Sequence, residues 1–268
     1  GDDGMNRETI RRQLPSLLLT VLFLLAWELL ARRMNAAYIL PSPTQILRRI
    51  YELRKPLLLV HLPATMAVVA VSLLLSLLLG IFLAILMDQS KTAERALYPL
   101  LVASQTIPTT ALAPLFVLWL GYGIWSKVLA AVLMTFFPIA VTLSDGFRAI
   151  PPEMTELMQT LGATRWQLFW KLKLPAVLPS FFTAIRMAIP LSVIGAAIGE
   201  WLGAQAGLGY FSRRMMTQLD GAGVFAPIVL LSVAAMLLTA LARQIETRAL
   251  RFRNHQDSDR EETRRRDS

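Results

Sequence analysis

The hydrophobic residues of this chain gather in long blocks rather than at amphipathic spacing. A helix of about 20 apolar residues crosses the roughly 30 Å hydrocarbon core of a bilayer, so blocks of this length indicate membrane spans. Six blocks can be drawn, at residues 14–31, 64–87, 96–120, 124–143, 175–199 and 224–242, and the first and last only just reach that length. The pattern predicts an all-α integral membrane protein with six transmembrane helices.

Composition supports this prediction and narrows the chemistry. Hydrophobic residues make up 55% of the 268 residues and charged residues only 17%, whereas a soluble domain carries about 25% charged residues. The absence of cysteine excludes a disulfide framework and a thiolate metal site, and two histidines do not suggest a metal site either. The net charge of +9 comes from basic residues beside the apolar blocks. Such residues set membrane topology, so we expect no nucleic-acid partner.

An even number of spans places both termini on one side of the membrane. If that side is the cytoplasm, most of the 27 Lys and Arg residues lie inside, as the positive-inside rule requires. The loop after the first span, with Arg48, Arg49 and Arg54, is a contrary signal. We therefore predict a multi-pass protein with both termini cytoplasmic.

The polar segments outside the spans divide the chain into three parts. Residues 1–4 precede Met5 and look like an expression remnant, and residues 1–13 form a cytoplasmic N-terminus. Residues 14–250 form one transmembrane domain, and the tail at 251–268 is expected to be disordered because it has almost no apolar residue. Within the domain, residues 44–53 predict a short amphipathic helix on the membrane surface with Thr44 as its N-cap. Its apolar face comprises Ile46, Leu47, Ile50 and Leu53.

A polar island separates the fourth and fifth spans. Two prolines open it, and Glu153 and Glu156 place negative charge in a first helical turn, where the helix dipole favours it. A short amphipathic helix stops at Gly162, and a second segment, with Thr164 as cap, leads to Leu-x-Leu-Pro at 172–175. The island is either an ordinary connector or a pair of short helices that docks into a groove on another protein.

Polar residues also interrupt the third and fifth blocks. Because proline frees a helical carbonyl that hydroxyl groups can satisfy, the stretch around Pro108 is either a broken helix that lines a translocation path or polar packing between helices. Arg186 is the one charge well inside a span, and we favour a structural role near the cytoplasmic end of the fifth span. Trp201, which follows Glu200 at the end of that span, is typical of an interfacial anchor. The polar residues around Pro108 are Ser104, Gln105, Thr106, Thr109 and Thr110.

The island resembles the EAA signature of bacterial ABC importer permeases. Glu156 stands at the Glu position, Gly162 follows at the spacing of the family, and Leu174-Pro175 closes the signature. Leu157 and Met158 stand where the family has two small residues. This departure toward bulk leaves the spacing intact.

Further stretches resemble the nitrate/sulfonate/taurine branch of these permeases. They are Pro41-Ser42-Pro43, Ile107-Pro108, the Leu-Gly-Tyr-Gly at 120–123, and the Gly-Glu-Trp-Leu-Gly-Ala at 199–204. The resemblance implies a permease of the bacterial inner membrane that works with a second permease copy, as a homodimer. It also implies two cytoplasmic ATPase subunits and an extracytoplasmic substrate-binding protein.

The resemblance also assigns roles to two sets of residues. The island becomes the coupling helix, which sits in a cleft of the ATPase and transmits its closure to the spans. The coupling residues are Glu153, Glu156, Leu157, Met158, Gly162, Ala163, Leu174 and Pro175. The residues assigned to the translocation path and outer gate are Gln105, Thr106, Pro108, Thr109, Arg186, Glu200 and Trp201.

The energy source and the substrate class follow from what the sequence contains. No Gly-x-x-x-x-Gly-Lys-[Ser/Thr] phosphate loop occurs, so we expect no ATPase activity and no cofactor in this chain, with ATP and Mg²⁺ bound by the partner ATPase. A secondary transporter would show inverted repeats and more intramembrane carboxylates, and a signalling or scaffold membrane protein would not need the island. The 199–204 stretch with Phe225-Ala226 resembles the subgroup for pyrimidine precursors of thiamine. Sulfonate, taurine and nitrate remain the alternative substrates.

Overall fold

The computed structural model describes the backbone of residues 2–266 and the side chains of residues 14–250. This part of the chain is helical and contains no strand. The disorder expected for the tail at 251–268 stays a prediction, because the side chains of these residues lie outside the described part of the chain. In chain order the elements are α1 (Asp2–Met34), α2 (Pro43–Glu52), α3 (Arg54–Pro56), the π-helical turn η1 (Leu57–His61), α4 (Leu62–Gln89), α5 (Lys91–Ser104), α6 (Thr109–Leu120), α7 (Ile124–Arg148), α8 (Pro152–Thr160), α9 (Arg165–Leu168), the π-helical turn η2 (Phe169–Lys173), α10 (Leu174–Gly203), α11 (Leu208–Thr217) and α12 (Gly221–Arg266).

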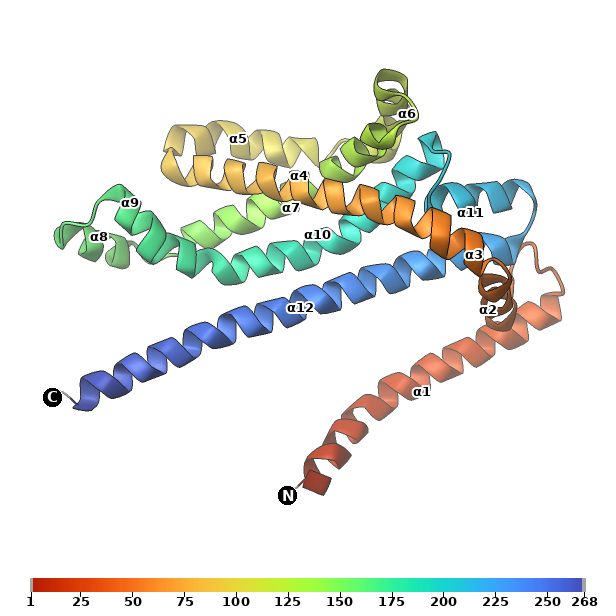
Figure 1. Cartoon of the computed structure of the whole chain (residues 1–268), viewed down its shortest axis with the longest axis horizontal. Helices are drawn as coiled ribbons and strands as arrows, with labels where there is room; N and C mark the ends of the chain where they lie inside the picture. Colours follow the sequence, from red (N-terminus) through yellow and green to blue (C-terminus); the bar gives the residue numbers. More distant parts are fainter. Residues whose placement is uncertain (1, 267–268) are drawn as a thin grey trace.

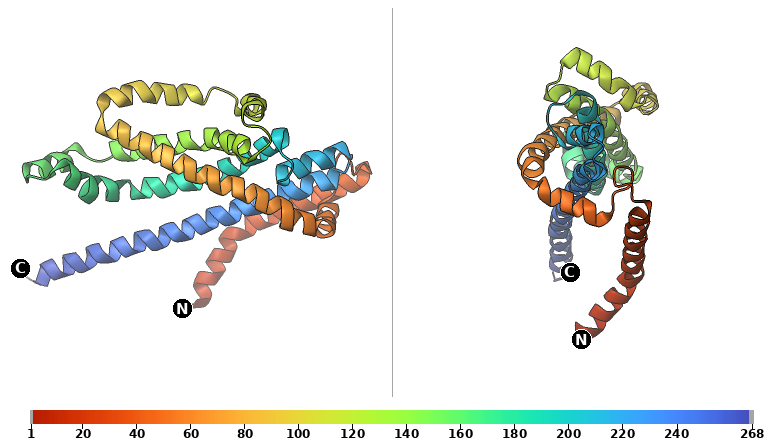
Figure 2. Two further views of the ribbon diagram at one scale, coloured as in Figure 1. Left: turned by 45° about the horizontal axis from the view of Figure 1, so that its top comes forward. Right: turned by 90° about the vertical axis from the view of Figure 1, so that its right-hand side faces the viewer.

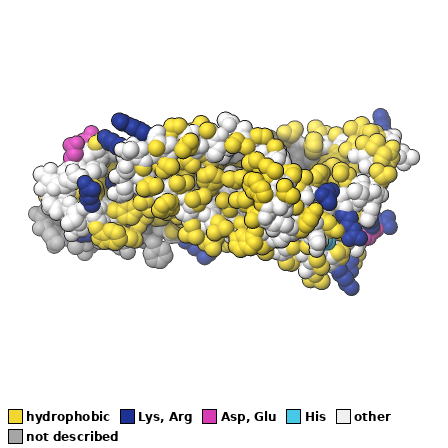
Figure 3. Space-filling view, turned by 90° about the horizontal axis from the view of Figure 1, so that it is seen from above, with side chains coloured by type: hydrophobic (Ala, Val, Ile, Leu, Met, Phe, Trp, Pro, Cys, Tyr) yellow, Lys and Arg dark blue, Asp and Glu magenta, His cyan; other side chains and the backbone are white. Residues whose placement is uncertain are grey.

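Several of these helices are long and apolar enough to cross a membrane. Hydrophobic side chains cover the middle of the face in Figure 3, whereas Lys and Arg gather toward its two ends. Five segments of the described chain meet this criterion singly, and the bent pair of α5 and α6 makes a sixth span if the two helices are counted together as one. The prediction of an all-α membrane protein with six spans is confirmed on that count. The five others in the described chain are Leu14–Met34, Arg54–Gln89, Ile124–Arg148, Arg165–Gly203 and Gly221–Leu250.

α7 is the central helix of the bundle and packs along both α4 and α10 (Figure 1). Glycines permit this close approach. A Cβ at Gly80 of α4 would lie 2.5 Å from Ile139 Cγ2, and a Cβ at Gly195 of α10 would lie 2.6 Å from Ala131 Cα. In lipid, where no hydrophobic force drives helices together, small residues at such contacts let backbones approach and gain dispersion energy.

The third apolar block is broken rather than continuous. α5 ends at Ser104, α6 begins at Thr109, and the two helices lie at 95° to each other. α5 returns along α4, whereas α6 turns away from both (Figure 1). Pro108 stands at the N-cap of α6 with an extended backbone. Because proline cannot donate to the preceding turn and disfavours a helical residue before it, the break falls at this position.

The sequence pattern predicted that the second segment of the island is a separate short helix. The structure shows instead that it is the first part of the fifth span. α9, η2 and α10 follow one another without interruption over Arg165–Gly203, so the fifth span begins well before Pro175. Pro175 cannot donate a backbone hydrogen bond, and the wider turn of η2 precedes it, with Leu174 N–H donating to the Phe169 carbonyl. η1 precedes Pro63 in the same way. The π-helical turns thus let the helix pass through a proline that was expected to mark its start.

α2 begins earlier than predicted, and its N-cap is Ser42 rather than Thr44. Ser42 Oγ accepts from Gln45 N–H at 3.3 Å, and Gln45 Oε1 accepts from Ser42 N–H at 2.9 Å, which completes a capping box. The cap lies there because a proline, which suits the first helical position, follows Ser42. Thr44 instead donates from its backbone and its hydroxyl to the carboxylate of Glu28. Ile46, from the predicted apolar face, is buried, so α2 packs on the bundle.

The molecule has two distinct ends. α8 and α9 lie at one end, near the turn between α4 and α5, and α2, α3 and α11 lie at the other (Figure 1). We call these the α8 end and the α11 end. The left-hand view of Figure 2 shows that α1 starts, and α12 finishes, away from the α11 end.

Candidate functional site

α8 projects from the bundle (Figure 1), and its apolar side chains Met154 and Leu157 are exposed. None of its residues is buried; Leu157 is 61% exposed, and Leu161, directly after the helix, is 77% exposed. Glu153 and Glu156 are exposed as well, and Met158 is half-buried. Exposed apolar side chains on a short helix indicate an interaction surface, and such a helix fits a groove on another protein.

Gly162 ends α8 in the left-handed conformation, with φ +80°. Its N–H donates to the Gln159 carbonyl at 2.9 Å, and Ala163 N–H donates to the Met158 carbonyl at 2.9 Å. These two bonds form a Schellman motif, which stops the helix. A Cβ at Gly162 would meet nothing within 4 Å, so the backbone conformation and not packing inside the chain requires glycine here. Thr164 then caps α9, as predicted.

The segment after α8 is firmly attached to the bundle. The ring of Phe169 stacks on that of Phe147 in α7, with centroids 6.4 Å apart. Lys173 Nζ lies 2.8 Å from both carboxylate oxygens of Asp88, which ties η2 to the last turn of α4. α8 therefore stands on an anchored base. Two more predicted coupling residues, Leu174 (exposed) and Pro175 (half-buried), lie in the first turn of α10.

The N-terminus of α11 is held by side chains from other helices. The first N–H groups of a helix have no partner within it. Here the backbone N–H groups of residues 207–209 donate in turn to His61 Nδ1 at 3.2 Å, Thr65 Oγ1 at 2.8 Å and Glu200 Oε2 at 2.8 Å. Thr65 Oγ1 also lies 3.0 Å from Glu200 Oε2. We call these three side chains the α11 clamp.

The clamp is closely packed around Glu200. Only 1% of this residue is exposed, and its Oε1 has no hydrogen-bond partner among the described residues. A buried carboxylate oxygen without a partner is unfavourable, so the remaining contacts must compensate. Gly207 has φ +118°, and a Cβ there would lie 2.2 Å from Glu200 Cδ. Glu200, assigned to an outer gate by resemblance, is therefore placed inside the clamp.

Sequence reasoning missed two members of the clamp, His61 and Thr65. They stand four residues apart and so share one helix face. A histidine immediately before a long apolar block was the only local sign of a polar role. Their partners lie more than 140 residues further along the chain, so no local pattern could reveal the pairing.

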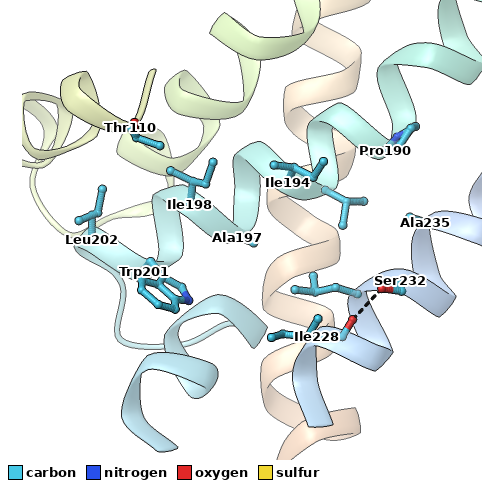
Figure 4. Close-up of a pocket in the computed structure, with 12 residues that line it drawn as sticks. Thr110, Pro190, Ile194, Ala197, Ile198, Trp201, Leu202, Ile228, Ser232 and Ala235 are labelled. Carbon is cyan, nitrogen blue, oxygen red and sulfur yellow. Dashed lines mark hydrogen bonds between the residues drawn. The ribbon is translucent and has the colours of Figure 1, made fainter. Parts of the chain in front are cut away.

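A pocket of about 590 Å³ lies between α6, α10 and α12. Figure 4 shows its lining, with Trp201 and Ile198 from α10, Thr110 from α6 and Ser232 from α12. Trp201 is thus the predicted path residue that lines this pocket, and Thr110 belongs to the polar stretch around Pro108. Thr110 and Ser232 carry the hydroxyl groups of an otherwise apolar lining.

The other predicted path residues lie elsewhere. Arg186 forms an ion pair with Glu246 of α12, with Nη1 and Oε2 2.6 Å apart, and so links α10 to α12. Both side chains are partly buried, and pairing offsets the cost of placing charge among apolar helices. Gln105, Thr106 and Pro108 are exposed at the break between α5 and α6, and Thr109 is half-buried.

Ion pairs also organise the α11 end. Arg49 lies 2.7 Å from Asp220 and 2.9 Å from Glu52, which fixes α2 to the turn before α12. Hydrogen bonds from Arg49 and Arg48 hold the pKa of Glu52 below its usual value, and the bond to Glu52 raises the pKa of Arg49. No group of three His, Cys, Asp or Glu residues able to hold a metal ion occurs in the part of the chain that the structure describes.

Solved structures of importers share this architecture. The chain aligns with one from the "MetNI methionine ABC transporter" in inward-facing conformations, with a TM-score of 0.64 and 21% identity, over 71% of this chain and 95% of that one. At this identity the likeness shows the fold alone.

Relatives that are similar in sequence show the family to which the chain belongs. The chain is 54% identical to the "Formylaminopyrimidine transport permease protein ThiX" of Halalkalibacterium halodurans, over 90% of this chain and 96% of the relative. It is 30% identical to the "Putative aliphatic sulfonates transport permease protein SsuC" of Bacillus subtilis, over 93% of this chain and 94% of the relative. The resemblance to the nitrate/sulfonate/taurine branch is confirmed.

One family profile spans the region that contains α8, the clamp residue Glu200 and the pocket. It is described as "Binding-protein-dependent transport system inner membrane component" and matches residues 76–251. Together with the multi-pass helical fold and the relatives above, this match makes the chain a multi-pass inner membrane protein. The chain belongs to the binding-protein-dependent transport system inner membrane component family.

Proposed function

We propose that this chain is the permease subunit of an ATP-driven importer and that α8 is the helix through which an ATPase subunit drives it. The observation that carries the proposal is that the apolar side chains of α8 are exposed, while η2, which follows α8 in the chain, is fixed to the bundle. Leu157 and Leu161 are exposed, while Phe169 and Lys173 fix the next turns to α7 and α4. An energy-supplying partner can engage this surface without unfolding the bundle.

The continuous helix gives α8 a mechanical route to the far end of the molecule. α9, η2 and α10 together span Arg165–Gly203, which is 39 residues. At 1.5 Å per residue this helix is about 58 Å long. Its first turn begins four residues after α8, beyond the turn at Gly162, and its last turn carries Glu200 of the clamp and Trp201 of the pocket. A displacement of α8 would therefore reach both features through one continuous helix.

The proposal fixes an orientation and a set of partners. The α8 end faces the cytoplasm and an ATPase subunit that binds ATP and Mg²⁺, and the α11 end faces an extracytoplasmic binding protein. Both termini lie on the cytoplasmic side, in agreement with the directions of α1 and α12 (Figure 2). Two copies of the chain form the path between them, each with its own ATPase subunit. The chain itself holds no cofactor and hydrolyses no ATP.

We infer that the substrate is a pyrimidine of the type that serves as a thiamine precursor. The support is the 54% identity to a protein described as a formylaminopyrimidine permease. The 30% identity to a protein described as a sulfonate permease makes sulfonates, taurine and nitrate the alternative.

Reconstituted transport tests this function. Proteoliposomes that hold the chain with its ATPase, and with the binding protein on the opposite side, should accumulate labelled formylaminopyrimidine only when ATP and the binding protein are both present. Taurine in excess should not compete. Uptake driven by an ion gradient without ATP would instead indicate a secondary transporter. Uptake of taurine in place of the pyrimidine would move the substrate to the sulfonate class.

A further inference from the structure

The pocket between α6, α10 and α12 lies on the face of α10 that points away from α7. On one face, Gly199 packs so closely on α7 that a Cβ would lie 2.8 Å from Lys127 Cα. The pocket face carries larger side chains at positions 194, 198 and 201. These positions are spaced so that they share one face of a helix. The sequence of α10 thus assigns small residues to packing and bulky ones to the pocket.

The walls of this pocket are apolar and carry no charge. None of its lining residues is Asp, Glu, Lys, Arg or His. The hydroxyl of Ser232 donates to the Ile228 carbonyl at 3.0 Å, which leaves its oxygen lone pairs as acceptors. Thr110 supplies a second hydroxyl, and Trp201, a residue that is 39% exposed, supplies an indole ring. Flat aromatic ligands are held in this way, by stacking on a ring and by a few polar groups that set their orientation.

An anion would be poorly accommodated in the same pocket. A sulfonate or nitrate that leaves water needs a cation or several donors in exchange, because an isolated charge is costly in an apolar site. The intramembrane arginine of α10, Arg186, is already paired with Glu246. Lys127 lies against Gly199, on the opposite face of α10 from the pocket. Neither cation lines the pocket.

We propose that this pocket binds an uncharged, planar nitrogen heterocycle during transport, with Trp201 as the stacking surface and Thr110 and Ser232 as the polar contacts. The assignment rests on the proposed transport function. It adds a location for the substrate within this chain and a selection against anions. The pocket volume of about 590 Å³ falls within the range of small-molecule sites. Trp201 follows Glu200 directly, so the α11 clamp holds the stacking ring at the end of α10.

The absence of cysteine from the sequence allows a clean accessibility experiment. Ala235→Cys places one thiol on the α12 wall of the pocket, Ile194→Cys places one on its α10 wall, and Thr217→Cys places one on the exposed surface of α11 as a control. Each variant would be assembled with its ATPase in lipid nanodiscs and labelled with a small water-soluble maleimide, both without nucleotide and in an ATP-trapped state. The probes are formylaminopyrimidine and taurine.

Formylaminopyrimidine at about ten times its dissociation constant should slow labelling of Ala235→Cys and Ile194→Cys about tenfold in at least one state, by mass action. Taurine should change neither rate, and neither probe should change the rate of Thr217→Cys. Equal protection by taurine, or no protection by the pyrimidine, overturns the assignment. Absence of labelling in both states means that lipid or a second copy fills the pocket, and overturns it as well. ATP-driven pyrimidine uptake without protection would reject the pocket alone, whereas absent uptake would reject the proposed function.

Discussion

Gly207→Ala should destabilise the protein by about 4 kcal/mol, because the substitution meets two obstacles at once. The backbone there has φ +118°, a conformation that side chains rarely adopt and that costs about 1–3 kcal/mol. The new Cβ would also lie 2.2 Å from Glu200 Cδ, inside a clamp without free space, and overpacking costs about 1–3 kcal/mol. Thermal unfolding of the purified protein in detergent should show a midpoint roughly 10 °C lower.

Gly123→Ala is the matched control for that variant. Gly123 also precedes a helix, α7, but has φ −69°, and a Cβ there meets nothing within 4 Å. This variant should unfold within about 1 °C of the wild type, since a surface substitution of this kind changes stability by less than about 0.5 kcal/mol. Equal midpoints for Gly207→Ala and the wild type would show that the clamp does not hold the N-terminus of α11 as described.

Gly162→Val should reduce ATP-driven uptake at least about tenfold while the complex stays assembled. Valine at φ +80° opposes the Schellman motif that ends α8, and the backbone penalty of about 1–2 kcal/mol would be relieved by a change in the direction of the helix. The bundle should tolerate the change, because a Cβ at Gly162 meets no atom of the chain within 4 Å. Uptake and ATP hydrolysis measured on the same proteoliposomes separate coupling from assembly.

Gly162→Asn separates the backbone requirement from a requirement for space. Asparagine adopts positive φ more readily than other side chains, so this variant should keep most of the uptake that Gly162→Val loses. Unchanged uptake in Gly162→Val would contradict the role assigned to α8. Equal loss in both variants would place the requirement in the groove of the partner and not in the turn.

The sequence predicted the helical spans because their signal is local and strong. Apolar blocks at 64–87 and 124–143 lie within α4 and α7, and the stop at Gly162 and the cap at Thr164 follow from turn chemistry that involves neighbouring residues. The break at Pro108 was one of two interpretations that the sequence left open, and it could be proposed because proline acts on the residues next to it. Each of these features depends on residues close together in the sequence.

The features that failed or were missed depend on distant partners or on competing local solutions. The start of the fifth span was placed at Pro175, but the π-helical turn of η2 carries the helix through that proline. Ser42 rather than Thr44 caps α2, because Pro43 takes the first helical position, and Thr44 binds Glu28 on another helix. His61 and Thr65 acquire their role only when η1, α4, α10 and α11 meet.

Site-specific cross-linking tests the central claim, that α8 is the surface which an ATPase engages. Leu161→Cys places a thiol at the α8 end, and Leu219→Cys places one at a similarly exposed apolar position at the α11 end, where Leu219 is 73% exposed. In membranes that contain the whole importer, a short thiol-to-amine reagent should join Leu161→Cys to the ATPase subunit and should not join Leu219→Cys to it. An ATPase cross-link from Leu219→Cys, or none from Leu161→Cys in a complex that hydrolyses ATP, would contradict the account.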